Sequence, residues 1–227
     1  MSDTTGQKSS RLPPSSDLTR QALIRAALKL FGSKGYDGTS TREIAAVANA
    51  NIGSIAYHFG GKEGLRLACA GFIVDTIQGI ASQALRADAD GPRSEAEAAA
   101  RLNLALERMV GFIVAAPQAG EIVQFVLREL AHPTPALDAI YSGVFEPVHK
   151  RLCQVWAEAT GEDAESDLTK LMVFTMVGQV IYFRIGRVAV LRRMGWADIG
   201  PKEAAEIIGV AKGNLAAMLA AHKGNKP

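Results

Sequence analysis

The amino-acid sequence predicts an all-α protein, and three observations support this fold class. Apolar residues recur at intervals of three and four along most of the 227 residues, as they do on one face of an α-helix. No stretch alternates polar and apolar residues with the period of two that a half-buried strand requires. Capping residues and prolines divide the pattern into segments of helical length, for example Ser94 before one segment and Pro117 after it.

The first 16 residues are rich in Ser, Thr and Pro and predict a disordered arm. Lys8 and Arg11 could enter a DNA minor groove as the arms of homeodomains do, and an inert tail is the alternative. The first helix is expected from Asp17 to Ser33, where the apolar residues share one face, and Gly35 should end it.

Residues 40–59, STREIAAVANANIGSIAYHF, predict two short helices joined by a tight turn. Ser40 or Thr41 can cap the first helix, and Asn49 tolerates the left-handed conformation that a sharp turn needs. Asn51 can cap the second helix, whose apolar residues should face inward. The positions left facing outward are Gly53, Ser54, Tyr57 and His58. Two helices joined in this way form a helix-turn-helix, whose second helix enters the DNA major groove.

Gly60 and Gly61 should end the second helix, and Lys62 opens a helix expected to run to about Leu85. A lysine in the first turn is unfavourable with the helix dipole. It is better explained if a DNA phosphate also binds at that helix start, and a solvated lysine is the alternative. This helix would connect the DNA reader to the rest of the chain.

The rest of the chain predicts a second helical domain, residues 83–222, after a DNA-binding domain of residues 17–77. Its helices are expected after the capping box Ser94–Glu97 up to Pro117, at Gln118–Ala131, from Thr134 to about Thr160 with a bend at Pro147, at Asp167–Met194, and at Pro201–His222.

Small residues form a stripe on the last helix, where Ala205, Gly209, Gly213 and Ala217 follow one another at intervals of four. Gly178 lies on the helix before it. Small side chains let helix backbones approach closely, and an intrachain contact would use them as well as a dimer would. Because a helix-turn-helix reads two half-sites through two-fold symmetry, we expect these residues to form a homodimer interface.

The charge of +2 is unevenly distributed, with eight Lys or Arg and four Asp or Glu up to Lys62. A basic N-terminal end suits a polyanion, although so small an excess can arise by chance. Cys69 and Cys153 are too far apart for a metal or redox motif and predict buried, reduced thiols. We expect a cytoplasmic protein that does not span a membrane, because the N-terminus lacks a signal sequence and the most apolar run, Leu171–Phe183, is shorter than the roughly 20 residues a span needs.

Catalytic motifs are missing from the sequence, so we expect neither an enzyme nor a cofactor. One pattern supports an alternative. Glu129 with His132, and Glu146 with His149, repeat the spacing of ligands in di-iron helix bundles, and Glu107 and Glu121 could complete the set. The alternative reading is a helical metal-binding protein, either a metal-sensing repressor or a di-metal carboxylate enzyme.

Polar side chains interrupt the apolar helices of the second domain, and we expect them to line a pocket for a small-molecule effector. For each residue, pairing with an acid or exposure to solvent is the alternative. The expected pocket residues are Arg128, His132, Tyr141, His149, Gln179 and Tyr182.

The stretch Thr19–Leu65 resembles the N-terminal domain of TetR-type transcriptional repressors. The resemblance is carried by LFGSKGYDGTS, TREIA, the pair Gly53-Ser54, the run YHF and the pair KE that follows it. Asn49 replaces the usual turn glycine, Ile52 a polar residue, and Ala56 an aromatic residue of many members. RELAHPTPA, EPVHKRL and GQVIYFRIGRVAVLRRMGW look like the C-terminal domain of the CerR-like branch of that family.

This resemblance implies a three-helix, helix-turn-helix DNA-binding domain followed by a helical ligand-binding and dimerisation domain. Such a protein would bind a palindromic double-stranded operator as a homodimer and repress transcription until an effector releases it. The residues expected at the DNA are Ser40, Thr41, Arg42, Asn51, Ile52, Gly53, Ser54, Tyr57, His58 and Lys62.

Overall fold

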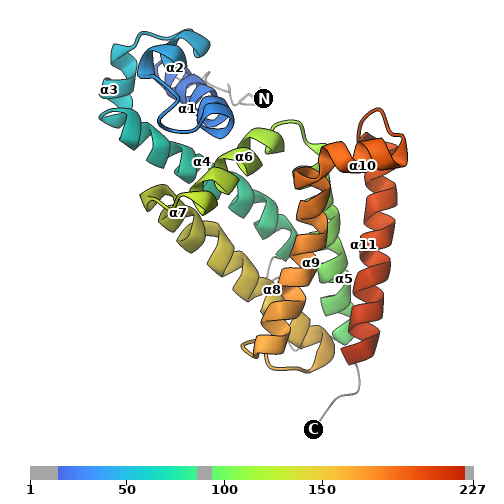
Figure 1. The fold of residues 1–227 in the computed structure, drawn as a ribbon. Helices are drawn as coiled ribbons and strands as arrows, with labels where there is room; N and C mark the ends of the chain where they lie inside the picture. The colour runs from blue at the N-terminus through green and yellow to red at the C-terminus, as the bar shows by residue number, and fades with distance from the viewer. Residues whose placement is uncertain (1–14, 86–93, 223–227) are drawn as a thin grey trace, which may run out of the picture.

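The computed structural model describes residues 15–85 and 94–222, which form helices and no strand (Figure 1). The elements are α1 Ser15–Lys34, α2 Thr41–Val47, α3 Gly53–Phe59, α4 Lys62–Leu85, α5 Glu95–Met109, the π-helical segment η1 Val110–Ala115, α6 Ala119–Ala131, α7 Pro135–Ile140, the π-helical segment η2 Tyr141–Phe145, α8 Glu146–Thr160, α9 Asp167–Ile185, α10 Arg187–Met194 and α11 Pro201–His222. The all-α prediction is confirmed. The predicted N-terminal arm lies outside the described residues except where α1 starts, and so does the loop 87–93.

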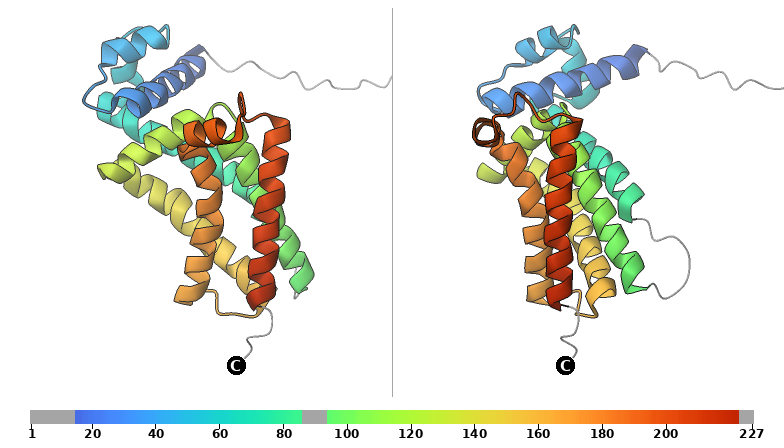
Figure 2. Two further views of the ribbon diagram at one scale, coloured as in Figure 1. Left: turned by 45° about the vertical axis from the view of Figure 1, so that its right-hand side comes forward. Right: turned by 90° about the vertical axis from the view of Figure 1, so that its right-hand side faces the viewer.

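Helices α1 to α3 form a small unit at one end of the molecule, and α4 runs from this unit into the larger body (Figures 1 and 2). There α5, α8, α9 and α11 lie alongside one another. Helices α6 and α7 lie between the body and the small unit, and α10 crosses the end of the body that faces the unit. The long helix α4 is thus shared by both parts.

The small unit has its own hydrophobic core, which also includes residues from α6 and α7. Ile44, Ile55 and Leu65 are buried at its centre, and Phe125 of α6 and Ile140 of α7 belong to the same cluster. Burying apolar surface stabilises the fold by about 25 cal/mol per Å². Because α6 and α7 contribute buried apolar side chains to this core, the packing of helices α1 to α4 depends on contacts with these two helices.

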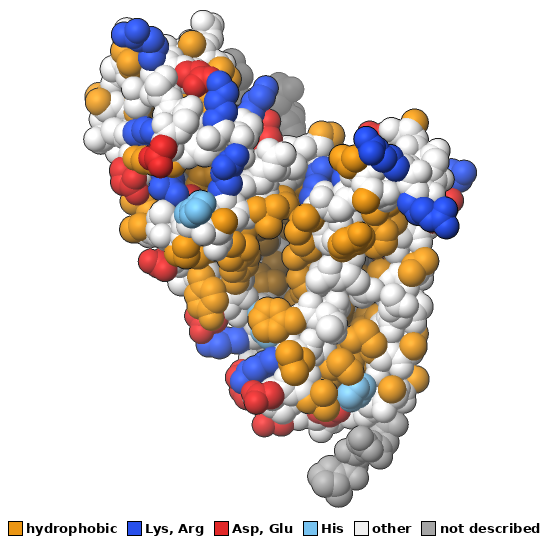
Figure 3. All heavy atoms as spheres, viewed as in Figure 1, with side chains coloured by type: hydrophobic (Ala, Val, Ile, Leu, Met, Phe, Trp, Pro, Cys, Tyr) orange, Lys and Arg blue, Asp and Glu red, His pale blue; other side chains and the backbone are white. Residues whose placement is uncertain are grey.

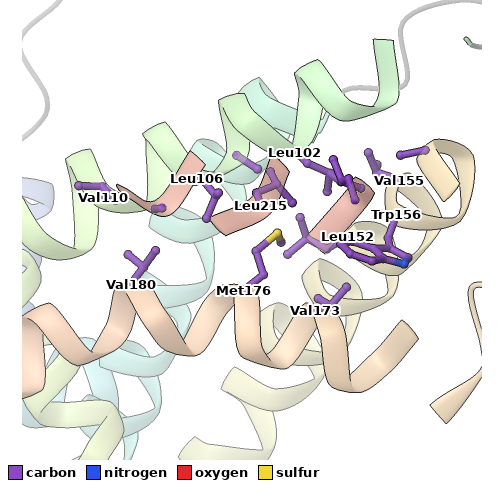
Figure 4. Packing of buried hydrophobic residues seen from close by; sticks show 14 of the residues in the cluster. Leu102, Leu106, Val110, Leu152, Val155, Trp156, Val173, Met176, Val180 and Leu215 are labelled. Carbon is purple, nitrogen blue, oxygen red and sulfur yellow. The ribbon is translucent and has the colours of Figure 1, made fainter. Parts of the chain in front are cut away.

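A second core fills the body between α5, α8, α9 and α11 (Figure 4). Met176 points from α9 toward Leu106 of α5 and Leu215 of α11, and all three side chains are fully buried. Trp156 of α8, also fully buried, lies at one end of the cluster.

Two of the predicted helices are interrupted. The expected bend at Pro147 is replaced by η2, after which Pro147 occupies the first turn of α8, where its missing N–H costs nothing. The expected helix Asp167–Met194 breaks at Gly186 into α9 and α10. On either side of the break, Arg184 donates to the carbonyls of Ile113 and Ala116 at 2.6 Å, and Arg187 to that of Val114 at 3.1 Å. These tertiary bonds hold the break against η1.

Three described helical stretches, Lys62–Ser82, Asp167–Ile185 and Pro201–His222, are long and apolar enough to cross a membrane by length and composition alone. The stretch Asp167–Ile185 extends beyond the run Leu171–Phe183, so the apolar stretch on this helix is longer than sequence analysis indicated. In the fold, each of these helices buries one face in a core.

The end of α11 is fixed by a carboxylate in the turn after α8. Trp156 Nε1 donates to Glu162 at 2.9 Å, and His222 Nδ1 lies 2.7 Å from the other carboxylate oxygen. Burial raises the pKa of Glu162, but the hydrogen bonds from Trp156 and His222 outweigh this, so the pKa lies below its ordinary value.

Replacing Glu162 with glutamine should therefore reduce stability in a pH-dependent way. A folded-state pKa below the unfolded value of about 4.3 means that the carboxylate stabilises the fold above that pH and loses this effect as the pH falls through the folded pKa. We expect Glu162→Gln to lower the free energy of unfolding at pH 7 by about 1–3 kcal/mol. The loss should shrink toward pH 3 in urea titrations. Glu165→Gln, on the same turn with an exposed side chain, is the matched control. Equal losses at both pH values would contradict the role of the charge.

Candidate DNA interface and effector site

The turn between α2 and α3 has the geometry that the sequence predicted. The Ser40 hydroxyl caps α2 by accepting a hydrogen bond from the Glu43 N–H at 3.1 Å. Asn49 has a φ of 49°, the left-handed conformation of a sharp turn. Asn51 Oδ1 accepts from the Gly53 N–H at 2.8 Å and so fixes the first turn of α3.

Helix α3 buries one side and exposes the other. Ile55 is buried, Phe59 is partly buried against the same core, and Tyr57 is 83% exposed. Because so little of its apolar surface is buried, an aromatic ring this exposed contributes little to the stability of the fold. The predicted DNA residues divide into exposed ones, which are Ser40, Arg42, Asn51, Ile52, Gly53 and Tyr57, and partly exposed ones, which are Thr41, Ser54, His58 and Lys62.

The junction of α3 and α4 is compact because of two glycines. Gly60 ends α3 with a φ of 73°, a conformation that favours glycine. A Cβ at Gly64 would lie 1.8 Å from the Phe59 carbonyl oxygen, so only glycine lets α4 begin so close to the end of α3. Sequence reasoning used the first of these glycines and missed the second.

Tyr36, in the loop after α1, fixes the start of α4. Lys62 Nζ lies 4.0 Å from the centre of the Tyr36 ring, and the Arg66 guanidinium lies 4.5 Å from it. Cation–π contacts of this kind stabilise exposed sites by about 0.5–1 kcal/mol. The side chain of Lys62 is thereby held over the Tyr36 ring, and sequence reasoning did not identify this role of Tyr36.

Side chains of α4 and α6 hold the small unit to the body, and we call Arg66 of α4 with Arg128 and Glu129 of α6 the α6 clamp. Arg66 Nε donates to Glu129 at 2.8 Å, and the two side chains are 11% and 3% exposed. Thr134 Oγ1 also donates to Glu129, at 2.5 Å. Arg128 donates to the carbonyls of Gly32 and Ser33 at 2.6 and 2.7 Å, which satisfies the C-terminal end of α1.

The predicted effector pocket is not formed as expected. Arg128, His132, Tyr141 and Tyr182 are exposed, so the expectation that they are interior is wrong. Gln179 accepts a hydrogen bond from Asn214 at 3.0 Å, and His149 stacks on Phe174 with ring centres 4.0 Å apart. For Tyr182 the physical reason is that α9 has one apolar face in the core and another at the surface, so its apolar character does not indicate burial all round.

Two of the six predicted residues line the same hollow in the described part of the chain. Tyr141 and His149 line a space of about 300 Å³ with Cys153 and Phe174. Figure 3 shows hydrophobic side chains gathered between α8 and α9. Burial raises the pKa of the Cys153 thiol and also that of Cys69, so the prediction of two buried thiols is confirmed.

An apolar cavity of about 90 Å³ lies elsewhere, between α4, α5, η1 and α8. Its wall consists of Ile77, Ile80, Ala81, Ala105, Met109, Phe112, Ile113, Val148 and Leu152, with the single charged residue Arg108. Small-molecule sites are typically apolar with a few polar groups. Sequence reasoning missed this cavity because it searched for polar residues, and the one available signal was Arg108 before the apolar run MVGFIVA.

The small-residue stripe lies on the surface. Gly178, Ala205, Gly209, Gly213 and Ala217 are all exposed, and a Cβ added at any of the three glycines would meet no atom within 4 Å among the described residues. The stripe is therefore not used for contacts within the chain. Large exposed apolar residues on the same two helices are Leu168, Leu171, Phe174, Tyr182, Ile185 and Val210.

Three carboxylates of the metal hypothesis are engaged elsewhere. Glu129 binds Arg66, Glu146 pairs with Lys150 at 2.7 Å, and Glu107 pairs with Lys212. Within residues 15–85 and 94–222, no three His, Cys, Asp or Glu side chains are close enough to hold a metal ion. The spacing in sequence is not matched by proximity in space.

The all-α fold and the exposed side of α3 define a class of protein, the helix-turn-helix DNA-binding regulators. Residues 23–69 match the family of bacterial regulatory proteins of the tetR family, and residues 98–222 match the C-terminal domain of the HTH-type transcriptional dual regulator CecR. The chain belongs to the TetR family of transcriptional regulators and has a CecR-type C-terminal domain, so the branch that sequence analysis named CerR-like is the CecR branch. Members of this family regulate transcription and are not enzymes.

Relatives and solved structures agree with this assignment. The HTH-type transcriptional dual regulator CecR of Shigella flexneri is 36% identical over 181 residues, which covers 78% of this chain and 80% of that protein. A crystal structure of AibR in complex with isovaleryl coenzyme A and operator DNA has a TM-score of 0.65 at 18% identity and covers 86% of this chain and 97% of that chain. A TetR-like regulator from Rhodococcus sp. RHA1 has a TM-score of 0.64 at 18% identity, covering 92% and 99%. The last two show likeness of fold.

Proposed function

We propose that this protein is a ligand-responsive repressor that binds a palindromic operator as a homodimer and is released by a small-molecule effector. The observation that carries the proposal is the exposed face of α3, on which Tyr57 stands out from a helix otherwise anchored by Ile55. Figure 3 shows Lys and Arg side chains over the same end of the molecule, with Asp and Glu side chains among them. Basic side chains around an exposed helix suit binding in a major groove.

The proposed contacts divide by role. Gly53, Ser54, Tyr57 and His58 of α3 would lie at base edges and the groove walls, whereas residues at the starts of α2 and α4 would bind phosphates. Phosphate contacts set affinity and its salt dependence, and base contacts set specificity. Lys62, oriented by Tyr36, is the basic residue we assign to a phosphate.

Replacing Tyr57 or Lys62 with alanine should weaken operator binding without unfolding the protein, because both side chains project from the core. For Lys62→Ala we expect a shallower slope of the logarithm of the binding constant against the logarithm of the salt concentration. The slope should change by about 0.9 per lost phosphate contact, and so by roughly two per dimer. Fluorescence anisotropy at several salt concentrations measures this slope.

The controls are Tyr141→Ala and Lys150→Ala, which remove an exposed tyrosine and an exposed lysine from the body. An unchanged slope in Lys62→Ala would remove this residue from the interface, and equal losses in the controls would show that the effect is not local.

The homodimer interface is assigned to α9 and α11. Their exposed faces combine the small-residue stripe with large apolar side chains, a combination that suits a buried helix–helix contact. Residues 17–77 form the proposed DNA-binding domain and residues 83–222 the effector-binding and dimerisation domain. Because the core of the first includes α6 and α7, the two domains are coupled mechanically.

The effector site is assigned to the apolar cavity beside α4, which replaces the pocket predicted from sequence. The first half of α4 contributes Leu65, Cys69 and Ile73 to the core of the DNA reader, and the second half contributes Ile77 and Ile80 to the cavity wall. A ligand that enlarges the cavity would therefore shift α4 and alter the spacing of the two readers. A coupling of about 1–3 kcal/mol between ligand and operator is typical of such switches.

The comparisons support regulation of transcription through DNA binding, and they do not identify the effector or the operator of this protein. The CecR relative is called a dual regulator, and AibR was crystallised with isovaleryl coenzyme A and operator DNA. We place the protein in the cytoplasm, acting without a cofactor. Repression can be tested by measuring transcription from the promoter beside the gene of this protein, with and without the protein. Higher transcription in the presence of the protein would contradict repression.

A further inference from the structure

The apolar cavity adjoins a more polar groove, and their junction indicates which ligand fits. The groove has a volume of about 470 Å³ and is bordered by α4, α5 and η1. Ile80, Arg108 and Phe112 line both hollows, so the two spaces meet at these side chains. A ligand in the cavity would thus have one end against apolar side chains and the other in the groove.

The charge at this junction is positive. Arg108 lies at the boundary, and the adjacent carboxylate of Glu107 is already engaged by Lys212. Within the described parts of the chain, Arg108 forms no ion pair. The guanidinium has five N–H donors and matches carboxylate and phosphate groups in a bidentate manner. The junction therefore favours an anion over a neutral or cationic group.

The cavity limits the size of the apolar part. A cavity of about 150 Å³ in another protein accommodates benzene. At about 90 Å³ the cavity of this protein is smaller. It suits an aliphatic chain of about three to five carbons rather than an aromatic ring or a long acyl chain.

We propose that the effector is a small amphipathic anion, with a short aliphatic chain in the apolar cavity and a carboxylate or phosphate head on Arg108. This inference rests on the proposed function only for the position of the site. It adds the chemical class of the ligand and assigns Arg108 as the residue that selects its charge.

Binding can be tested by isothermal titration of the full-length protein with matched probes. These are monocarboxylates of three to eight carbons, alkyl phosphates of the same lengths, and the corresponding alcohols and amines. We expect anions to bind and amines not to, with affinity rising about fourfold per methylene until the cavity is full at about five carbons. The carboxylate and phosphate series decide between the two heads.

Two variants separate the head from the chain. Arg108→Met keeps an apolar stem without the charge and should weaken anion binding about tenfold or more while leaving alcohols unchanged. Ala81→Leu should fill part of the cavity and shift the preferred chain to a shorter length. Arg192→Met, which changes an exposed arginine on α10, is the control and should bind as the original protein does.

Operator binding by each variant, measured in parallel, distinguishes this inference from the proposed function. Equal affinity for anions and alcohols, or an Arg108→Met variant that binds anions normally, would overturn the inference even if other compounds release the operator. Anions that bind through Arg108 but leave operator affinity unchanged would support the ligand class and contradict the effector role.

Discussion

If the proposed homodimer forms through α9 and α11, replacing Gly213 with leucine should give a monomer and weaken operator binding at least about 100-fold, because a bivalent contact with two half-sites becomes a monovalent one. The side chain cannot enter a close helix–helix contact without separating the helices. Within one chain it meets open space, since no atom lies within 4 Å of a Cβ at this position. The substitution even removes a helical glycine, which favours the helix by about 1 kcal/mol.

The experiment therefore separates assembly from folding. Sedimentation or light scattering gives the mass, circular dichroism gives the helix content, and anisotropy gives operator affinity. Gly71→Leu is the matched control, because Gly71 of α4 is also exposed and helical with open space at its Cβ position. A Gly213→Leu variant with the mass of a dimer would place the interface elsewhere.

Replacing Glu129 with alanine should lower the free energy of unfolding by about 3–5 kcal/mol, the cost of leaving a buried charge without its partner. The uncompensated charge would be Arg66, which is 11% exposed. Because the α6 clamp fixes the first turns of α4, operator affinity should also fall in conditions where the variant is folded.

A double variant distinguishes loss of charge balance from loss of packing. Arg66→Met combined with Glu129→Leu removes both charges and should recover most of the lost stability in urea titrations, since a buried pair can be replaced by apolar residues at little cost. If the double variant is as unstable as Glu129→Ala, the pair stabilises the protein by a mechanism other than charge compensation.

Much of the helical framework could be predicted from the sequence, because it depends on neighbours within one or two turns. The Ser94 capping box and the start of α4 at Lys62 are where local chemistry placed them. The same holds for the helix-turn-helix. A left-handed Asn49 and a buried Ile55 follow from residue type and spacing alone.

The effector site could not be predicted in the same way. Arg128 interrupts an apolar helix and looked like a pocket residue, yet its partners are carbonyls of Gly32 and Ser33, nearly a hundred residues earlier. A cavity is a defect in the packing of several helices and is not encoded at any single position. Its apolar lining is indistinguishable in sequence from ordinary core.

The sequence by itself determined the fold class, most helix boundaries and the position of α3, the second helix of the helix-turn-helix. Caps, turn residues and the 3.6-residue period are local properties. Only the tertiary structure decided the break at Gly186, the use of Arg128 and Glu129 in the α6 clamp, and the position of the cavity beside α4. Each of these depends on groups distant in the chain. Buried polar atoms take whichever partners the fold brings within reach, and residue spacing does not specify those partners.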